Sequence, residues 1–164
     1  MKGLEQVRRA VMERLEQAGV RALSKMDEAP ETRPDAPVAA VAVREGKSGG
    51  AGFGSYLGQE TDPETGEIRE LYGKRLELEL AVDIYAPAAE SCEGAAMTAA
   101  GVLLEGLGAG VRPLEVKWEE PRWDRERELF LCRGSARCRA YFTAAMDDES
   151  GTLLDFELKG VVSC

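Results

Sequence analysis

Hydrophobic residues recur with two different periods along this chain, and the order of those periods restricts the fold class more than any other feature. A helical period, with apolar residues three and four positions apart, runs from about Gly3 to Met26 and again from about Ala88 to Leu107. Two-residue alternation, which is typical of half-buried strands, occupies most of the remaining chain. The pattern predicts a single α+β domain over residues 1–164, an antiparallel β-sheet packed by two amphipathic helices in the order α-β-(β)-β-α-β-β-β-β.

Each helix is expected to bury one stripe of its surface. Gly19 is expected to bend the first helix, because glycine lowers helix stability by about 1 kcal/mol relative to alanine. The second helix is expected to use Ser91 as its N-cap and to approach the sheet closely through small residues. The expected stripes are Leu4, Val7, Val11, Leu15, Ala18, Ala22 and Met26 in the first helix, and Cys92, Ala95, Ala96, Ala99, Val102 and Leu103 in the second.

The strongest strand signal is Arg75–Tyr85, where five aliphatic residues alternate with mostly polar ones, and it is expected to be the long central strand. A short strand is expected at Val38–Val43. Residues 45–73 are rich in glycine and are expected to form a long, flexible, partly strand-like excursion with a turn at 62–66. After the second helix the alternation places Leu114, Val116 and Trp118 on one face, predicts a hairpin between Glu128–Cys132 and Ala136–Thr143, and ends in a strand at Leu154–Leu158.

The four cysteines are expected to be core thiols, because their spacing does not match a zinc site and the chain has no histidine. Cys132 and Cys138 are expected to face each other across the predicted hairpin, which would allow a disulfide in an oxidised preparation. The other two are Cys92 and Cys164.

Composition and motifs argue against several function classes. A net charge of −9 disfavours a nucleic-acid surface, and no apolar run approaches the roughly 18 residues of a membrane span. The string Gly46-Lys47-Ser48 lacks the earlier glycine and the following helix of a phosphate-binding loop. We therefore expect a cytoplasmic, non-enzymatic protein with no cofactor, no metal, no nucleic-acid partner and no membrane partner. An acid–base enzyme is a further hypothesis. It would require a pocket around Glu77, Glu79 or Asp83 in which that carboxyl group has a perturbed pKa.

Charge and aromatic residues indicate candidate contact surfaces. Residues 1–26 carry a net charge of +3, which leaves −12 on the remaining 138 residues of a chain whose total is −9. Such asymmetry could dock the first helix of one copy onto the body of another, although a solvated helix face of mixed charge is the simpler explanation. The expected partner or subunit contacts are Arg8, Arg9, Phe53, Tyr56, Tyr72 and Lys74.

Several short strings, together with the order of elements, give the chain a family resemblance. The strings are Tyr56-Leu57-Gly58, Leu71-Tyr72-Gly73-Lys74, Asp83-Ile84-Tyr85-Ala86-Pro87, the helix from Ser91, and Phe156-Glu157-Leu158-Lys159-Gly160. In these features the chain resembles the tail-completion proteins of tailed bacteriophages and prophages, of the tail-terminator or head-to-tail joining type.

The resemblance implies a structural protein that self-assembles into a ring, often a hexamer in that family, at the head–tail junction, where it contacts the tail tube and head-connector proteins. It also implies a bacterial host cytoplasm and, in an active prophage, the virion as the location. The alternative is an intracellular α+β binding or adaptor domain that recognises its partner through the 45–73 loop. Concentration-dependent ring formation would separate these two hypotheses.

Overall fold

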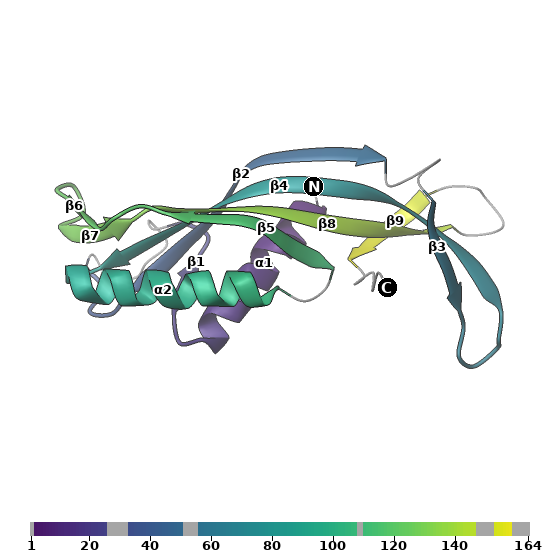
Figure 1. Ribbon diagram of the computed structural model, residues 1–164, viewed down its shortest axis with the longest axis horizontal. Coiled ribbons are helices and arrows are strands. Elements are labelled where there is room, and N and C mark those ends of the chain that lie inside the picture. The colour runs from purple at the N-terminus through teal and green to yellow at the C-terminus, as the bar shows by residue number, and fades with distance from the viewer. Residues whose placement is uncertain (1, 26–32, 51–55, 108–109, 147–152, 159–164) are drawn as a thin grey trace.

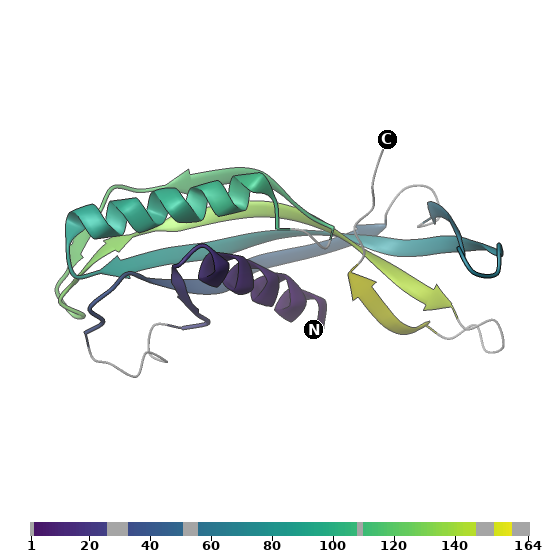
Figure 2. The same ribbon diagram turned by 90° about the horizontal axis from the view of Figure 1, so that it is seen from below.

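The computed structural model describes residues 2–25, 33–50, 56–107, 110–146 and 153–158. These residues form one sheet of nine strands with two helices on the same face (Figures 1 and 2). The α+β class and the predicted order of elements are confirmed, with two short strands added. The elements are α1 (Lys2–Gln17), β1 (Arg21–Leu23), β2 (Val38–Gly50), β3 (Tyr56–Thr61), β4 (Ile68–Ala86), α2 (Ala89–Glu105), β5 (Val111–Trp118), β6 (Arg122–Asp124), β7 (Leu129–Cys132), β8 (Gly134–Met146) and β9 (Leu153–Leu158).

Strand β4 is the spine of the sheet. Its 19 residues extend about 60 Å at the usual rise of a strand. One edge pairs with β2 and then β3, and the other edge pairs with β7 and then β8. Strands β5 and β9 add to β8, and β6 adds to β7. All of these pairings are antiparallel, and β1 is parallel to β2, so the sheet is mixed.

The two-residue alternation in β4 places one face of the strand in the core, as predicted. Leu76, Leu78, Leu80, Val82 and Ile84 are all buried. The intervening residues Arg75, Glu77 and Glu79 lie on the opposite face and retain solvent exposure. The helices pack on the aliphatic face, so the charged face of the sheet is left without a helical layer.

Helix α1 ends earlier than predicted, because Gly19 terminates it instead of bending it. Gly19 adopts a left-handed backbone with φ 85°. Its N–H donates to the carbonyl of Glu16, and the N–H of Val20 donates to the carbonyl of Leu15 at 2.9 Å. This pair of bonds is the Schellman arrangement that closes a helix. Val20 and Ala22 are still buried, but Val20 lies in the turn after α1 and Ala22 lies in β1 instead of in the helix.

Helix α2 buries the predicted stripe of small and aliphatic residues. Cys92, Ala95, Ala96, Ala99, Val102 and Leu103 are the buried positions. The N-cap prediction is wrong, because the N-cap is Ala88 and no side chain caps the helix there. The Ser91 hydroxyl lies inside the first turn and donates to the carbonyl of Ala88 at 2.9 Å.

Most of the predicted excursion over residues 45–73 is regular strand. Residues 44–50 continue β2, β3 follows the undescribed residues 51–55, and β4 begins at Ile68, seven residues before the predicted start. The turn at 62–66 is confirmed, since the Gly66 N–H donates to the Asp62 carbonyl at 2.8 Å. These glycine-rich segments are strands because they pair with β4. The pairing joins residues far apart in the sequence, so the local sequence pattern did not predict it.

The predicted hairpin between residues 128–132 and 136–143 is wrong. Strands β7 and β8 follow one another along the same edge of β4 and pair with it at different heights. Cys132 is opposite Ile84 and Cys138 is opposite Leu78, so the two thiols are about 20 Å apart along the strand. A disulfide between them is excluded. Cys92, Cys132 and Cys138 are buried free thiols, and Cys164 lies outside the described residues.

A β-bulge in β5 moves Leu114 away from the face predicted for it. The register shifts between Pro113, which pairs with Cys138, and Glu115, which pairs with Arg137. Leu114 is the extra residue and is exposed, whereas Val116 and Trp118 pack against the core. An extra residue reverses the side-chain alternation, and its position could not be read from the sequence.

Candidate functional site

The face of the sheet opposite the helices carries a charge-balanced network. Lys47, Glu77, Arg139 and Arg112 occupy one row across β2, β4, β8 and β5, and Glu45, Glu79, Arg137 and Glu115 occupy the next. Arg139 donates to the Glu77 carboxylate at 3.0 Å, and Arg44 lies 3.9 Å from that of Glu79. Exposed pairs of this kind contribute about 0–1 kcal/mol each, so the network makes the face polar without stabilising it strongly.

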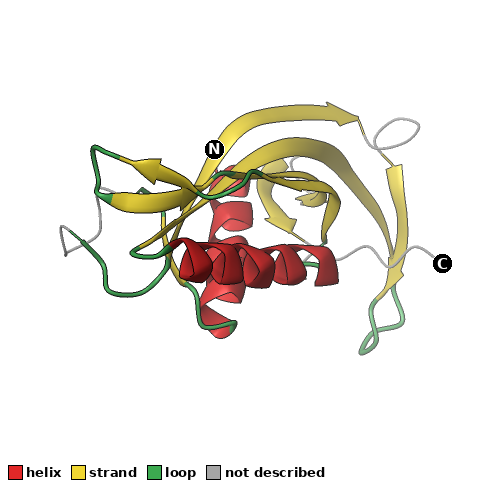
Figure 3. Ribbon diagram, turned by 60° about the vertical axis from the view of Figure 1, so that its left-hand side comes forward, coloured by secondary structure: helices red, strands yellow, loops and turns green. Residues whose placement is uncertain are grey.

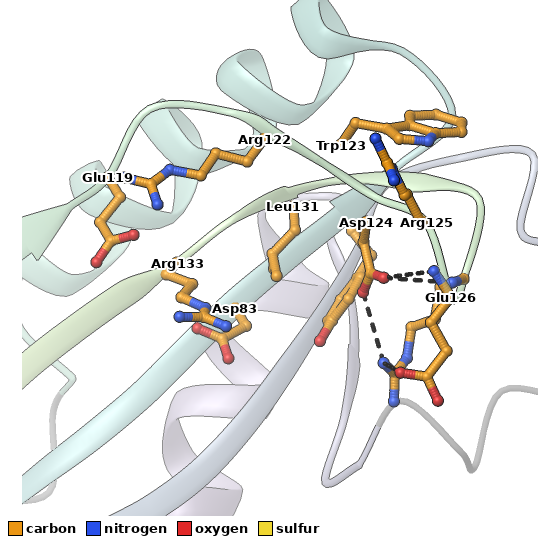
Figure 4. A pocket seen from close by; sticks show the side chains of 11 residues that line it. Asp83, Glu119, Arg122, Trp123, Asp124, Arg125, Glu126, Leu131 and Arg133 are labelled. Atoms are coloured by element: carbon orange, nitrogen blue, oxygen red, sulfur yellow. Dashed lines mark hydrogen bonds and ion pairs between the residues drawn. The ribbon is translucent and has the colours of Figure 1, made fainter.

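A cavity of about 430 Å³ lies where this face meets the hairpin of β6 and β7 (Figure 4). Its lining combines four arginines and four carboxylates with two aromatic rings and one leucine. The lining residues are Asp83, Tyr85, Glu119, Arg122, Trp123, Asp124, Arg125, Glu126, Arg127, Leu131 and Arg133.

The hairpin that forms one wall of the cavity is held by a side-chain turn. The Asp124 carboxylate accepts hydrogen bonds from the backbone N–H groups of Glu126 at 3.0 Å and Arg127 at 3.3 Å. Arg127 lies 3.5 Å from the second oxygen of Asp124 and 5.6 Å from the centre of the Tyr85 ring. Asp124 and Arg127 therefore act as structural residues that fix the wall.

Asp83 is the most perturbed carboxyl group of this cavity. Its Oδ1 atom is buried and has no hydrogen-bond partner. Burial raises the pKa of the Asp83 carboxyl above its ordinary value, against the attraction of Arg44 and Arg133. In Figure 4 the guanidinium of Arg133 points toward Asp83, and that of Arg122 points toward Glu119.

The cavity brings charged groups and aromatic side chains together. Asp83 meets the requirement for an acid–base site in its location and in the direction of its pKa, whereas Glu77 and Glu79 are paired with arginines outside this cavity. Tyr85 is a second group of this lining whose pKa is raised, again because burial disfavours its charged form. A charge-balanced rim around the exposed Trp123 matches the composition of interface hot spots.

A second candidate surface is the arm, which we define as β3, the turn 62–67 and residues 68–73 of β4. It projects beyond both helices (Figures 1 and 2). The rings of Tyr56 and Tyr72 meet edge to face at 5.7 Å, and the Tyr72 hydroxyl donates to Glu70 at 2.6 Å. Hydrogen bonding to Glu70 raises the pKa of Tyr72. Ile68 is 65% exposed, so the arm presents apolar and aromatic surface to solvent.

The predicted contact residues fall in two separate places. Tyr56 and Tyr72 meet on the arm, and Lys74 follows them on β4 as an exposed residue. Arg8 and Arg9 are on α1, beneath the body of the sheet (Figure 1). Arg9 is exposed, whereas Arg8 is half-buried and paired with Glu5 on the same helix. Phe53 lies outside the described residues.

Sequence reasoning missed most of the cavity lining and four exposed apolar residues, one of which is Ile68 of the arm. Trp123 lies in a strand that was not predicted, and Met97 and Leu104 lie on the outer side of α2. The signal for the last two was available, because both fall outside the buried stripe of that helix. Asp83 was the one lining residue that the sequence analysis named for a pocket, and the others come together only through the pairing of β4, β6 and β7.

Within the described ranges, no group of three or more cysteine, aspartate and glutamate side chains is placed to hold a metal ion. No described helix is both long enough and apolar enough to cross a membrane. No protein-family model matches the chain, and no curated protein matches its sequence.

Proposed function

We propose that the protein is a non-enzymatic structural subunit that self-associates into a ring, in the manner of the phage tail-completion proteins that its sequence resembles. The ring would cap a tail tube at the head–tail junction and present one surface to a head connector. Each subunit would offer two different patches, as any head-to-tail ring contact requires.

The projecting arm is the observation that supports this proposal. Residues 68–71 of β4 pair with β3, while their second edge takes no strand among the described residues. A two-stranded ribbon is marginally stable in water by itself. An exposed isoleucine and two tyrosines on such a ribbon are explained if a neighbouring subunit covers them.

The experiment that tests the proposal is absolute mass by light scattering after size-exclusion chromatography, across protein concentration. We expect a species of several subunits, seen as a ring by electron microscopy. Ile68→Glu should raise the concentration needed for assembly at least about tenfold, because a buried unpaired carboxylate weakens an interface by more than about 1.4 kcal/mol.

The matched control is Leu114→Glu, which makes the same kind of change at an exposed leucine on the body of the sheet. It should assemble as the wild type does. A wild-type chain that stays monomeric up to about 1 mM, or an Ile68→Glu variant that assembles normally, would contradict the proposal.

The second candidate function is a binding or adaptor domain that uses the arm to recognise a different protein. Among the described residues β3 pairs with β4 alone, which favours this candidate because the unpaired edge of a strand can accept an extended peptide by strand addition. A chain that is monomeric at every concentration and that binds a partner strand at β3 would support this second candidate.

A further inference from the structure

The outer side of α2 carries an apolar ridge that no other described part of the chain covers. Met97 is 72% exposed and Leu104 is 69% exposed. The only charged residues of this helix are Glu90, Glu93 and Glu105, so the eleven positions between Glu93 and Glu105 are uncharged. Figure 3 shows α2 lying across α1 with its outer side free of other described elements.

Two glycines on the same side of α2 have no close packing partner among the residues that the structure describes. A Cβ atom at Gly94 or at Gly101 would meet no heavy atom within 4 Å. Glycine weakens a helix interior, and the closely packed side of α2 is built from alanine, cysteine, valine and leucine instead. Uncovered glycines leave room for another backbone or a large side chain to approach the helix.

The glycines and the large residues alternate along one line. Gly94, Met97, Gly101 and Leu104 are separated by three, four and three positions, the spacing that places residues on one helical face. Along this line the two glycines leave hollows, and the large side chains of Met97 and Leu104 project between them as knobs.

We propose that this face is a docking surface for the α2 helix of a second copy, packed antiparallel about a two-fold axis at residue 99. In that register Met97 of one copy faces Gly101 of the other, and Leu104 faces Gly94. All four large side chains of the pair enter glycine hollows. A parallel pairing in register would instead place methionine against methionine and glycine against glycine.

The self-complementary spacing identifies the occupant as a second copy. An unrelated helix would need its own matching knobs, whereas the two-fold register supplies them from the same four residues. The small contact area limits the strength of the pairing between two α2 helices. A helix of 17 residues is about 25 Å long and buries about 500 Å² in such a pair, well below the roughly 1,200 Å² of a stable complex. The pairing is weak between free chains and gains strength where copies are already held close together.

Salt distinguishes this contact from one driven by opposite charges. An antiparallel pair brings Glu93 of one copy to the height of Glu105 of the other, and α2 has no basic residue to offset them. Salt screens this repulsion, so the pairing should strengthen as ionic strength rises. A contact between a basic helix and an acidic body would instead weaken as ionic strength rises, because salt screens the attraction.

The test is sedimentation equilibrium of the Ile68→Glu protein, whose arm contact is disabled, from about 10 µM to about 1 mM. We expect a monomer–dimer equilibrium that tightens with salt. Gly101→Leu should weaken it at least about tenfold by filling the hollow, although leucine strengthens an isolated helix. Glu13→Leu adds a leucine to α1 and should leave the dimer unchanged.

The double variant Met97→Gly with Gly101→Met exchanges the knob and the hollow, so it should pair within about threefold of its parent while Met97→Gly alone does not. A parent that is monomeric at about 1 mM, a Gly101→Leu variant that dimerises normally, or an exchange that restores nothing would each overturn the proposal. A wild-type chain that forms this dimer but no ring would instead count against the ring alone.

Discussion

Trp118 and Gly134 form the tightest side-chain approach to a glycine in the described sheet. The two residues are directly opposite each other on β5 and β8. A Cβ atom at Gly134 would lie 2.2 Å from Cζ3 of the Trp118 ring. Gly134→Ala should therefore lower the free energy of unfolding by about 1–3 kcal/mol, measured by urea denaturation, because the ring must move out of its packed position.

Gly49→Ala is the matched control for that prediction. Gly49 is also a strand glycine, but a Cβ atom there meets nothing within 4 Å. Its substitution should change stability by no more than about 0.5 kcal/mol, or stabilise slightly by restricting the unfolded chain. Equal stability of the two variants would show that the Trp118 ring does not require the glycine.

The carboxyl group of Asp83 should make the protein less stable as pH rises. Because burial raises its folded-state pKa above the unfolded value, the folded state binds the proton more tightly. The resulting stability is complete below the unfolded pKa near 4 and is lost as pH rises through the folded pKa. Because Asp83→Asn removes the ionisation, this variant should have the same Tm as the wild type near pH 3.5 and a Tm about 1–3 °C higher at neutral pH.

A Tm difference between wild type and Asp83→Asn that does not change with pH would contradict the raised pKa. Glu79→Gln is the control, since that carboxylate occupies the same strand face but lies beside Arg44. Its removal should give no comparable gain at neutral pH. Thermal unfolding followed by circular dichroism across pH measures all three proteins.

At the scale of elements, the buried residues within a helix or strand could be predicted from the sequence, whereas the pairing of strands far apart in the chain could not. The buried residues of β4 and α2 follow directly from period-two and period-3.6 patterns. Gly134 shows the limit, because a glycine between two alternating segments is typical of a turn. Here it makes room for Trp118, and the chain runs straight on from β7 to β8. The cavity depends on those pairings, so the sequence alone could not assemble it.

The arm should open as a separate unit when its turn is weakened. The Asp62 carboxylate accepts hydrogen bonds from the N–H groups of Glu64 at 2.8 Å and Thr65 at 3.2 Å. Asp62→Ala removes them, and a ribbon with little other support has a low opening free energy. Amide hydrogen exchange in β3 and residues 68–71 should accelerate about fivefold to tenfold, while residues 76–84 of β4 keep their protection.

Asp124→Ala provides the control on the other hairpin, because Asp124 makes the same kind of turn before β7. It should accelerate exchange in β6 and β7 and leave β3 unchanged. Faster exchange throughout β4 in either variant would show that the hairpins and the core open together, against the independence expected here.

At the scale of the whole molecule, the two proposed contacts have different symmetry. The arm contact would join two different patches and so generate a ring, whereas the α2 contact would join identical patches about a two-fold axis. A protein with both contacts can pair two rings face to face. The arm and the ridge of α2 involve different residues, so each contact should survive the loss of the other.

The uneven charge of the chain bears on the orientation of the ring contact. Residues 1–26 are net basic and the rest is strongly acidic, and Arg9 is exposed on the outer side of α1. Arg8→Glu with Arg9→Glu should weaken assembly about tenfold at about 50 mM salt, with a smaller effect at about 500 mM, because screening shortens the reach of exposed charges. Arg9 should account for most of the loss, since Arg8 is already paired with Glu5.

The control for this charge reversal is Lys47→Glu with Arg112→Glu, which reverses two exposed basic residues on the charged face of the sheet. Both double variants change the formal charge from −9 to −13, so general repulsion between subunits rises equally. A specific role for α1 therefore requires that its variant loses more assembly than the control by light scattering. If both variants assemble as the wild type does, the basic end of the chain is a solvated helix face. If both fail equally, total charge and not the position of Arg9 governs the association.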